Sequence, residues 1–170
     1  MTSLSDMQIN PLTPGHWSEL LRIRLYPEQK RYVPSPVQVQ GQYIFDRQDK
    51  KAPFEVFVIE VADQVAGFFT LVKDVDDYLW FGGFQVDIAF QNAGIGRAVF
   101  QRLFAFVVKS PEYAGISLNV QYSNKTVIRF YQRMGLSLVA MMQPGEEPLW
   151  LMKISRENIM RMLKSYKHQG

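Results

Sequence analysis

The sequence has 170 residues, of which 47% are hydrophobic and 21% are charged, a composition that excludes an intrinsically disordered chain. It contains no cysteine and only two histidines, His16 and His168. We therefore expect no disulfide framework, no zinc–thiolate or histidine-rich metal site, no cysteine nucleophile and no Ser-His-Asp triad. Nineteen basic against sixteen acidic residues give a formal net charge of +3, too small an excess to predict nucleic-acid binding.

The length favours one domain over residues 1–170. No stretch approaches the ~20 consecutive apolar residues that a membrane-spanning helix needs. The first ten residues, MTSLSDMQIN, contain Asp6 and no basic residue, so they do not resemble a signal peptide. We therefore expect no membrane association and a cytoplasmic location.

The first part of the chain predicts one strand and two helices. Residues 6–12 favour a short strand that ends in a proline- and glycine-containing turn. Apolar residues at helical spacing predict a helix over residues 16–25, which Pro27 ends. Ser35 and the proline after it are typical of a helix start, so a second helix is expected from there to about Arg47.

The middle of the chain changes from helical to strand-like periodicity. Residues 54–61 (FEVFVIEV) are rich in β-branched and aromatic side chains and predict a strand. A tight turn then leads into residues 65–73, the expected hairpin partner. A further turn precedes residues 78–89, which predict a long strand.

The remaining elements alternate between helices and strands. In chain order they are a helix at 94–109, a strand at 116–121, a helix at 124–134, strands at 136–142 and 149–154, and a helix at about 156–167. Gly135 is the residue expected to cap the second of these helices. Because antiparallel hairpins precede a β-α-β arrangement, the class is α/β or α+β with one mixed sheet.

The junction of strand and helix at residues 86–100 (VDIAFQNAGIGRAVF) predicts an anion site. Gly94 and Gly96 lack Cβ atoms, so a ligand can approach the backbone closely there. The first N–H groups of a helix have no acceptor within the helix and attract negative charge, and Arg97 adds a positive charge. A diphosphate is the natural ligand, although the same pattern also occurs in ordinary turns. The Walker A motif is absent, and Val99 stands where a dinucleotide fingerprint needs its third glycine.

The pattern Gln91-x-x-Gly94-x-Gly96 resembles motif A of the GNAT superfamily of N-acetyltransferases, Q/R-x-x-G-x-G/A. In that family this turn binds the diphosphate of acetyl-coenzyme A. The strand before it also matches, with Val86 at the usual valine and Ile88 where proline is common. The resemblance implies that the cofactor-binding residues are Val86, Ile88, Gln91, Asn92, Ala93, Gly94, Ile95, Gly96, Arg97 and Ala98.

A second block, residues 117–136 (SLNVQYSNKTVIRFYQRMGL), resembles motif B of the same family. The positions in register are Leu118, Val120, Asn124, Ile128, Phe130, Tyr131, Arg133 and Gly135. The two motifs occur in the family's order, separated by a helix and a loop. Asn124 and Tyr131 are implied to contact acetyl-coenzyme A, but Asn124 could serve only as a helix N-cap and Tyr131 only as a core aromatic.

The resemblance implies a GNAT-like fold: a mixed, mostly antiparallel twisted sheet of about seven strands with helices on both faces. Residues 6–50 would form the acceptor-side helices, residues 55–154 the acetyl-coenzyme A core, and residues 155–170 a C-terminal helix. The implied reaction moves acetyl from acetyl-coenzyme A directly to a primary amine, with no metal and no acyl-enzyme.

Two residues are catalytic candidates under this resemblance. Tyr131 could donate a proton to the leaving thiolate, because a phenol of pKa ~10 matches a thiol of pKa ~8.5. The attacking amine must lose a proton, and Asp87, beside the motif A valine, is the candidate base. Other acids that could take that proton, or could be ordinary surface residues, are Glu28, Glu55 and Glu60.

The acceptor is suggested by a weaker resemblance to the diamine and polyamine (spermine/spermidine) acetyltransferases. It rests on residues 27–33 (PEQKRYV) and on the aromatic start of the long strand. A polyamine needs acidic and aromatic lining to hold its charges. The candidate lining residues are Glu28, Tyr32, Trp80 and Asp87.

Other functions remain open at this point. The acceptor could instead be a peptide N-terminus or an antibiotic amine, and the chain could be a non-catalytic acetyl-coenzyme A-binding module. The expected partner is a small-molecule amine. A homodimer is a further expectation, because an apolar stripe marks the C-terminal helix at Ile159, Met162, Leu163 and Tyr166.

Overall fold

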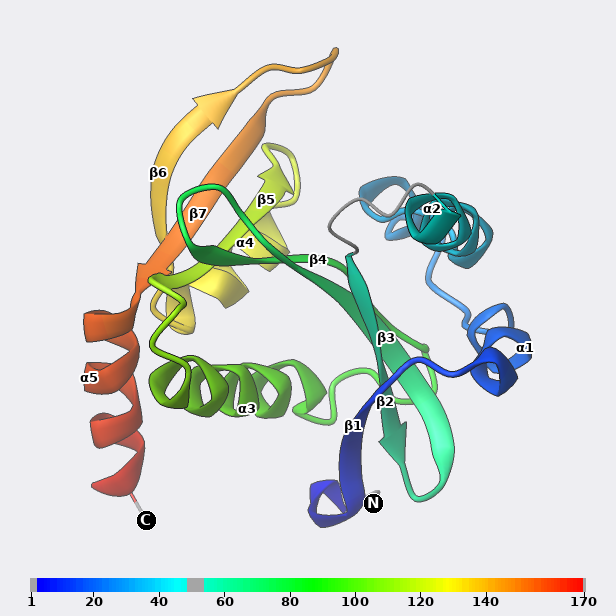
Figure 1. Cartoon of the computed structure of the whole chain (residues 1–170), viewed down its shortest axis with the longest axis horizontal. Helices are drawn as coiled ribbons and strands as arrows, with labels where there is room; N and C mark the ends of the chain where they lie inside the picture. The colour runs from blue at the N-terminus through cyan, green and yellow to red at the C-terminus, as the bar shows by residue number, and fades with distance from the viewer. Residues whose placement is uncertain (1–2, 49–53, 170) are drawn as a thin grey trace. The chain divides into compact units, whose positions relative to one another are not determined.

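The computed structural model describes residues 3–48 and 54–169 (Figure 1). The strands within those ranges are β1 (Met7–Pro11), β2 (Glu55–Val61), β3 (Gln64–Lys73), β4 (Tyr78–Val86), β5 (Gly115–Gln121), β6 (Ser137–Met142) and β7 (Leu149–Ser155). The α-helices there are α1 (Trp17–Leu20), α2 (Pro36–Gln48), α3 (Ile95–Lys109), α4 (Lys125–Arg133) and α5 (Arg156–Lys167).

The strands form a seven-stranded sheet in the order β1-β2-β3-β4-β5-β7-β6 among the described residues. The pairs β1–β2, β2–β3, β5–β7 and β6–β7 are antiparallel. The pair β4–β5 is parallel and joins residues 78–80 to residues 115–117. This confirms the predicted mixed, mostly antiparallel sheet.

The chain divides into two compact units, and β4 and α3 each contribute to both. Unit 1 contains residues 1–72 and 81–98, and unit 2 contains residues 73–80 and 99–170. Motif A therefore lies in unit 1 and motif B in unit 2. The expectation of a single domain over the whole chain stays a prediction.

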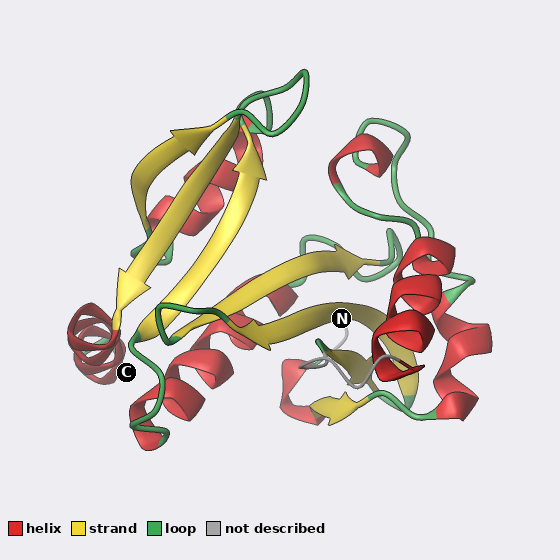
Figure 2. Ribbon diagram, turned by 45° about the horizontal axis from the view of Figure 1, so that its top comes forward, coloured by secondary structure: helices red, strands yellow, loops and turns green. Residues whose placement is uncertain are grey.

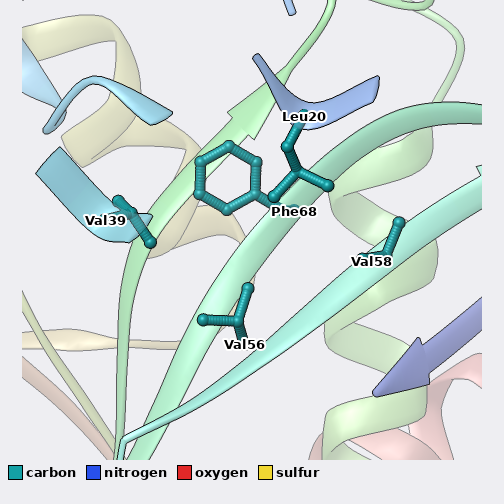
Figure 3. Packing of buried hydrophobic residues seen from close by; sticks show 5 residues of the cluster. All are labelled: Leu20, Val39, Val56, Val58 and Phe68. Carbon is teal, nitrogen blue, oxygen red and sulfur yellow. The ribbon is translucent and has the colours of Figure 1, made fainter. Parts of the chain in front are cut away.

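The core of unit 1 lies between its helices and the β2–β3 hairpin. Figure 3 shows the Phe68 ring of β3 between Leu20 of α1 and Val39 of α2, with Val56 and Val58 of β2 beside it. All five side chains are buried. Alternate β2 residues point into this core, as the period of two in a strand requires. Burial of these side chains holds α1 and α2 against the hairpin.

Unit 2 is built on the three strands β5, β7 and β6, which Figure 2 shows side by side. α5 packs against β5 and β7 and buries Ile159 completely. Of the apolar stripe of α5, Ile159 packs on its own unit and the other three residues are half-buried, so the homodimer stays a prediction. β6, by contrast, is exposed along its whole length. Its large exposed apolar side chains are Leu138, Val139, Met141 and Met142.

Two predicted boundaries near motif A are wrong. The helix expected over residues 16–25 ends at Leu20, and the strand expected over residues 78–89 ends at Val86. The reason is tertiary hydrogen bonding: the Ile88 N–H donates to the carbonyl oxygen of Arg24 at 3.0 Å. The peptide groups of this segment bond to the end of β4 instead of continuing a helix, so local propensity is overridden.

Candidate active site

The motif A turn combines two left-handed backbone conformations with a helix start. Asn92 has a φ of 60° and Gly94 a φ of 82°. α3 begins at Ile95, and its first hydrogen bond runs from the Ala98 N–H to the Gly94 carbonyl oxygen at 3.1 Å. A Cβ atom on Gly94 would be strained by that φ and would lie 3.3 Å from Leu4 Cδ1. The turn thus uses glycine where the backbone requires it.

This geometry presents backbone donors to a ligand. The N–H groups of Ile95 and Gly96 lie in the first turn of α3, where the helix offers them no carbonyl acceptor. Left-handed residues in a turn orient neighbouring N–H groups into a concave anion site, and the helix dipole adds to it. The Asn92, Gly94 and Arg97 residues are exposed, whereas the Ile95 side chain is buried. The buried Ile95 side chain therefore anchors the turn, while the other three residues are exposed to solvent.

Gln91 braces this turn with its side chain. Its Nε2 donates to the Val86 carbonyl oxygen at 2.9 Å and to Gln29 Oε1 at 2.9 Å. Gln29 Nε2 in turn donates to Gln91 Oε1 at 3.1 Å. The Gln91 side chain is thus directed into unit 1 and ties the turn to the end of β4.

Asp87 lies just past the end of β4 and is 7% exposed. Its carboxylate accepts hydrogen bonds from the Arg24 N–H at 2.8 Å, the Ala89 N–H at 2.9 Å and Arg24 Nη2 at 3.4 Å. Burial acts to raise the pKa of Asp87, but these donors outweigh burial and hold the pKa below its ordinary value. A carboxylate with a lowered pKa that already accepts three hydrogen bonds is a weak proton acceptor at neutral pH. The geometry therefore favours a positioning role for Asp87 over that of a general base.

The motif B residues lie on β5 and α4 in unit 2. Asn124 is at the N-cap position of α4, yet its side chain makes no capping hydrogen bond to the described first turn of that helix. Its main chain makes only the ordinary first helical hydrogen bond, in which its carbonyl oxygen accepts from the Ile128 N–H at 3.0 Å. The carboxamide of Asn124 is therefore not used as the cap that its position suggests.

Tyr131 is a buried residue on α4. Its ring packs against Phe100 and Phe130, with ring centroids 5.6 Å and 5.3 Å away. Burial raises the pKa of the Tyr131 phenol well above its ordinary value, so the hydroxyl stays protonated at neutral pH. A neutral phenol is suited to donate a hydrogen bond rather than to accept a proton.

The acceptor candidates fall into both units. Glu28 is exposed and Tyr32 half-buried in unit 1, and Tyr32 lies under the Arg31 guanidinium, whose carbon is 4.5 Å from the ring centroid. Trp80 is half-buried on β4 in unit 2. Glu55 and Glu60, the two other glutamates considered as a base, have polar partners. Glu55 Oε2 lies 3.4 Å from Arg47 Nη2, and Glu60 accepts from Asn10 Nδ2 at 2.9 Å.

Several residues around motif A were not singled out by the sequence analysis. Gly83 lies within β4 with a φ of 61°, a local distortion of the strand, and Thr70 Oγ1 donates to the carbonyl oxygen of the preceding residue, Gly82, at 3.0 Å. A glycine pair within a strand is a signal of such a distortion. Arg24 and Gln29, by contrast, carry no local signal, because their partners lie more than sixty positions away in the sequence.

Neither a metal centre nor a membrane span is found in the described ranges. Over residues 3–48 and 54–169, no group of three or more histidine, cysteine, aspartate or glutamate side chains could hold a metal ion. Within the same ranges, no helix is both long and apolar enough to cross a membrane.

Comparison with known proteins shows that the chain matches a known family. Residues 20–136 match the model of the acetyltransferase (GNAT) family. A comparison with curated protein sequences found no match. Among solved structures, the spermidine N-acetyltransferase from Vibrio cholerae in complex with CoA and spermine is similar, with a TM-score of 0.73 and 16% identity over 92% of this chain and 99% of that one.

Two further solved structures have the same fold. A putative acetyltransferase from T. thermophilus gives a TM-score of 0.76 at 12% identity, over 96% of this chain and 93% of that one. Ard1 from Thermoplasma volcanium gives 0.67 at 21% identity, over 88% of this chain and 97% of that one. At these identities the structures support the fold alone, whereas the family model matches more than half of the chain. The chain therefore belongs to the GNAT acetyltransferase family.

Proposed function

We propose that this protein is an N-acetyltransferase that moves an acetyl group from acetyl-coenzyme A to a primary amine. The observation that carries the proposal is the motif A turn, where Asn92 and Gly94 in left-handed conformations lead into the exposed start of α3. Membership of the GNAT family supports the same reaction. The similar V. cholerae enzyme has CoA bound in its structure, which supports the choice of cofactor.

The turn fits the diphosphate of this cofactor. Backbone N–H groups from Asn92 to Gly96 would hold the phosphate oxygens, and the Arg97 side chain would add positive charge. Val86, the last residue of β4, and Ile88, two residues beyond it, would lie along the pantetheine arm. Gln91 would contribute by shaping the turn rather than by direct contact, because its carboxamide is bonded inward.

Acetyl-coenzyme A supplies an acetyl group activated as a thioester. The nitrogen of the acceptor forms a bond to the acetyl carbon while the carbon–sulfur bond breaks. Tyr131, whose O–H is intact at neutral pH, would hydrogen-bond the departing sulfur, and solvent would supply the proton of the thiol, because the raised pKa makes the buried phenol a weaker acid than in water. Water would take the proton of the amine, since Asp87 already accepts three hydrogen bonds and its pKa is lowered. Asn124 would hydrogen-bond the cofactor through its carboxamide.

A polyamine is the first candidate for the acceptor. The similar V. cholerae enzyme has spermine bound in its structure, and Glu28, Tyr32 and Trp80 offer an acid and two aromatic rings. Cations bind favourably to such groups.

The charge of the acceptor-side segment favours a second candidate. Lys30 and Arg31 lie two and three residues after Glu28, and both are exposed, so this segment is more basic than acidic. Such a surface favours an amine that also carries a carboxylate, such as an amino acid or a peptide N-terminus, over a polycation.

A binding measurement tests the proposed cofactor, and an assay with a panel of amines tests the proposed acceptor. Calorimetry with CoA should show binding, and acetyl-coenzyme A with spermidine, spermine, putrescine, amino acids, aminoglycosides and peptides should release thiol with one class. The absence of heat with CoA would refute the cofactor site. Binding without thiol release from any amine would indicate a non-catalytic module, and release with peptides alone would show that a polyamine is not the acceptor.

A further inference from the structure

The segment that follows α1 is fastened to the motif A turn by a reciprocal pair of carboxamides. Gln29 Nε2 donates to Gln91 Oε1 at 3.1 Å, and Gln91 Nε2 donates to Gln29 Oε1 at 2.9 Å. Both side chains are partly buried and both belong to unit 1. Each carboxamide uses its donor and its acceptor at once, which neither a carboxylate nor an ammonium group could do.

Each glutamine of this pair is also bonded to the backbone of its own segment. Gln29 Oε1 accepts from the Tyr26 N–H at 3.1 Å, and Gln91 Nε2 donates to the Val86 carbonyl oxygen at 2.9 Å. These bonds determine the orientation of both carboxamides. Rotating Gln91 by half a turn would place its oxygen against the Val86 carbonyl oxygen, two acceptors with no proton between them.

A second fastening lies a few residues away. The Asp87 carboxylate accepts from the Arg24 N–H at 2.8 Å, and the Ile88 N–H donates to the Arg24 carbonyl oxygen at 3.0 Å. Residues 24–29 are thus joined to residues 86–91 at two separate places. Because the Arg24 contacts remain when Gln29 is replaced, the role of Gln29 can be tested without detaching the segment.

We propose that Gln29 is a positioning residue for the cofactor turn, acting through Gln91. This inference rests on the proposed function. Gln91 directly precedes Asn92, the first left-handed residue of the turn, so the hydrogen bonds that fix the Gln91 side chain limit the freedom of the turn's N–H groups. A turn that is ordered before the ligand arrives loses less entropy on binding. Gln29 touches no reacting atom in this scheme, so its loss weakens cofactor binding and leaves the chemical step unchanged.

A double-mutant cycle on CoA binding tests the coupling. Gln29→Ala and Gln91→Ala should each weaken CoA binding about fivefold, which is the range of a net intramolecular hydrogen bond. The double variant should bind no more weakly than the weaker single variant, because the two residues act as a unit. In steady-state assays Gln29→Ala should raise the KM for acetyl-coenzyme A and keep kcat. Gln64→Ala, an exposed glutamine at the start of β3, is the matched control and should change neither quantity.

Hydrogen exchange in the ligand-free protein gives a readout that does not depend on the cofactor. Gln29→Ala should speed exchange of the amides from Asn92 to Gly96, while Gln64→Ala should not. Additive effects in the cycle, a fall in kcat at unchanged KM, or unaltered exchange would each overturn the positioning role. If wild-type protein fails to bind CoA, the proposed function fails and this role fails with it. If wild type binds and Gln29→Ala binds equally well, the positioning role alone is wrong.

Discussion

The two family motifs hold their functional groups in different ways. In unit 1, directional hydrogen bonds from Asp87 and Gln91 fix the backbone of the turn, and positive φ values at Asn92 and Gly94 orient its N–H groups. In unit 2, the Tyr131 ring is held by packing against other rings. The Asn124 side chain, at the N-cap position, makes no capping hydrogen bond to the described residues of α4.

This difference predicts different responses to substitution. Hydrogen bonds weaken steeply with distance and angle, so small polar changes around the turn should alter cofactor binding and the pH dependence of stability. Packing tolerates a change that conserves shape, so α4 should accept the loss of a hydroxyl without losing its fold.

The largest expected effect is that of Tyr131→Phe. The phenylalanine keeps the ring contacts with Phe100 and Phe130 but cannot donate a hydrogen bond. We expect kcat to fall about 100-fold, at the lower end of the loss when one donor to a developing negative charge is removed, with CoA affinity and melting temperature unchanged. Phe130→Leu is the packing control: it should lower the melting temperature and leave kcat close to that of wild type. A Tyr131→Phe enzyme with full activity would contradict the assignment.

Asp87→Asn should lower the free energy of unfolding by about 2 kcal/mol at pH 7, because an amide cannot accept from every donor that now faces the carboxylate. The pKa of Asp87 is lowered in the folded state, so its stabilisation is complete above the unfolded pKa of about 3.9 and is lost as the pH falls through the folded pKa. Urea unfolding should therefore show a wild-type advantage that shrinks below about pH 4.

Asp63→Asn, at an exposed hairpin turn, is the matched control and should show no such pH-dependent difference. An equal difference between wild type and Asp87→Asn at pH 7 and at pH 2 would mean that the carboxylate charge does not hold the segment.

Gly94→Ala tests the backbone of the turn directly. A left-handed conformation costs a non-glycine residue about 1–2 kcal/mol, so CoA binding should weaken about tenfold if the turn relaxes to a negative φ. Gly145→Ala is the control, because a Cβ atom there meets nothing within 4 Å among the described residues. Calorimetry on both variants decides the matter, and unchanged affinity in Gly94→Ala would remove the turn from the binding site.

The smallest expected effect compares two helix starts in unit 2. Ser155 caps α5, with its Oγ accepting from the Asn158 N–H at 3.2 Å, so Ser155→Ala should cost about 1 kcal/mol of stability. Asn124→Ala should cost less, because its side chain makes no such bond to the described residues of α4. Thermal unfolding measures both, and CoA titration of Asn124→Ala should show weakened binding. A full cap penalty at Asn124 with unaltered affinity would indicate a purely structural role.

Much of the fold could be predicted from the sequence because its signals are local. Runs of β-branched and aromatic residues around a tight turn located the β2–β3 hairpin, and Gly135, with a φ of 96°, closes α4 as expected from its position. The failures lie where distant segments meet. The helix expected to reach residue 25 ends at Leu20, because residues 24 and 88 share a backbone hydrogen bond that no local pattern reveals.

The sequence by itself determined the turn chemistry and the order of the two motifs. Glycines, helix starts and alternating apolar residues act over a few neighbouring positions, so they can be recognised without coordinates. Only the tertiary structure decided which groups the side chains of Asp87 and Gln91 contact. Their partners, Arg24 and Gln29, lie more than sixty residues earlier in the chain, and a lowered carboxylate pKa depends on donors that folding alone brings into contact.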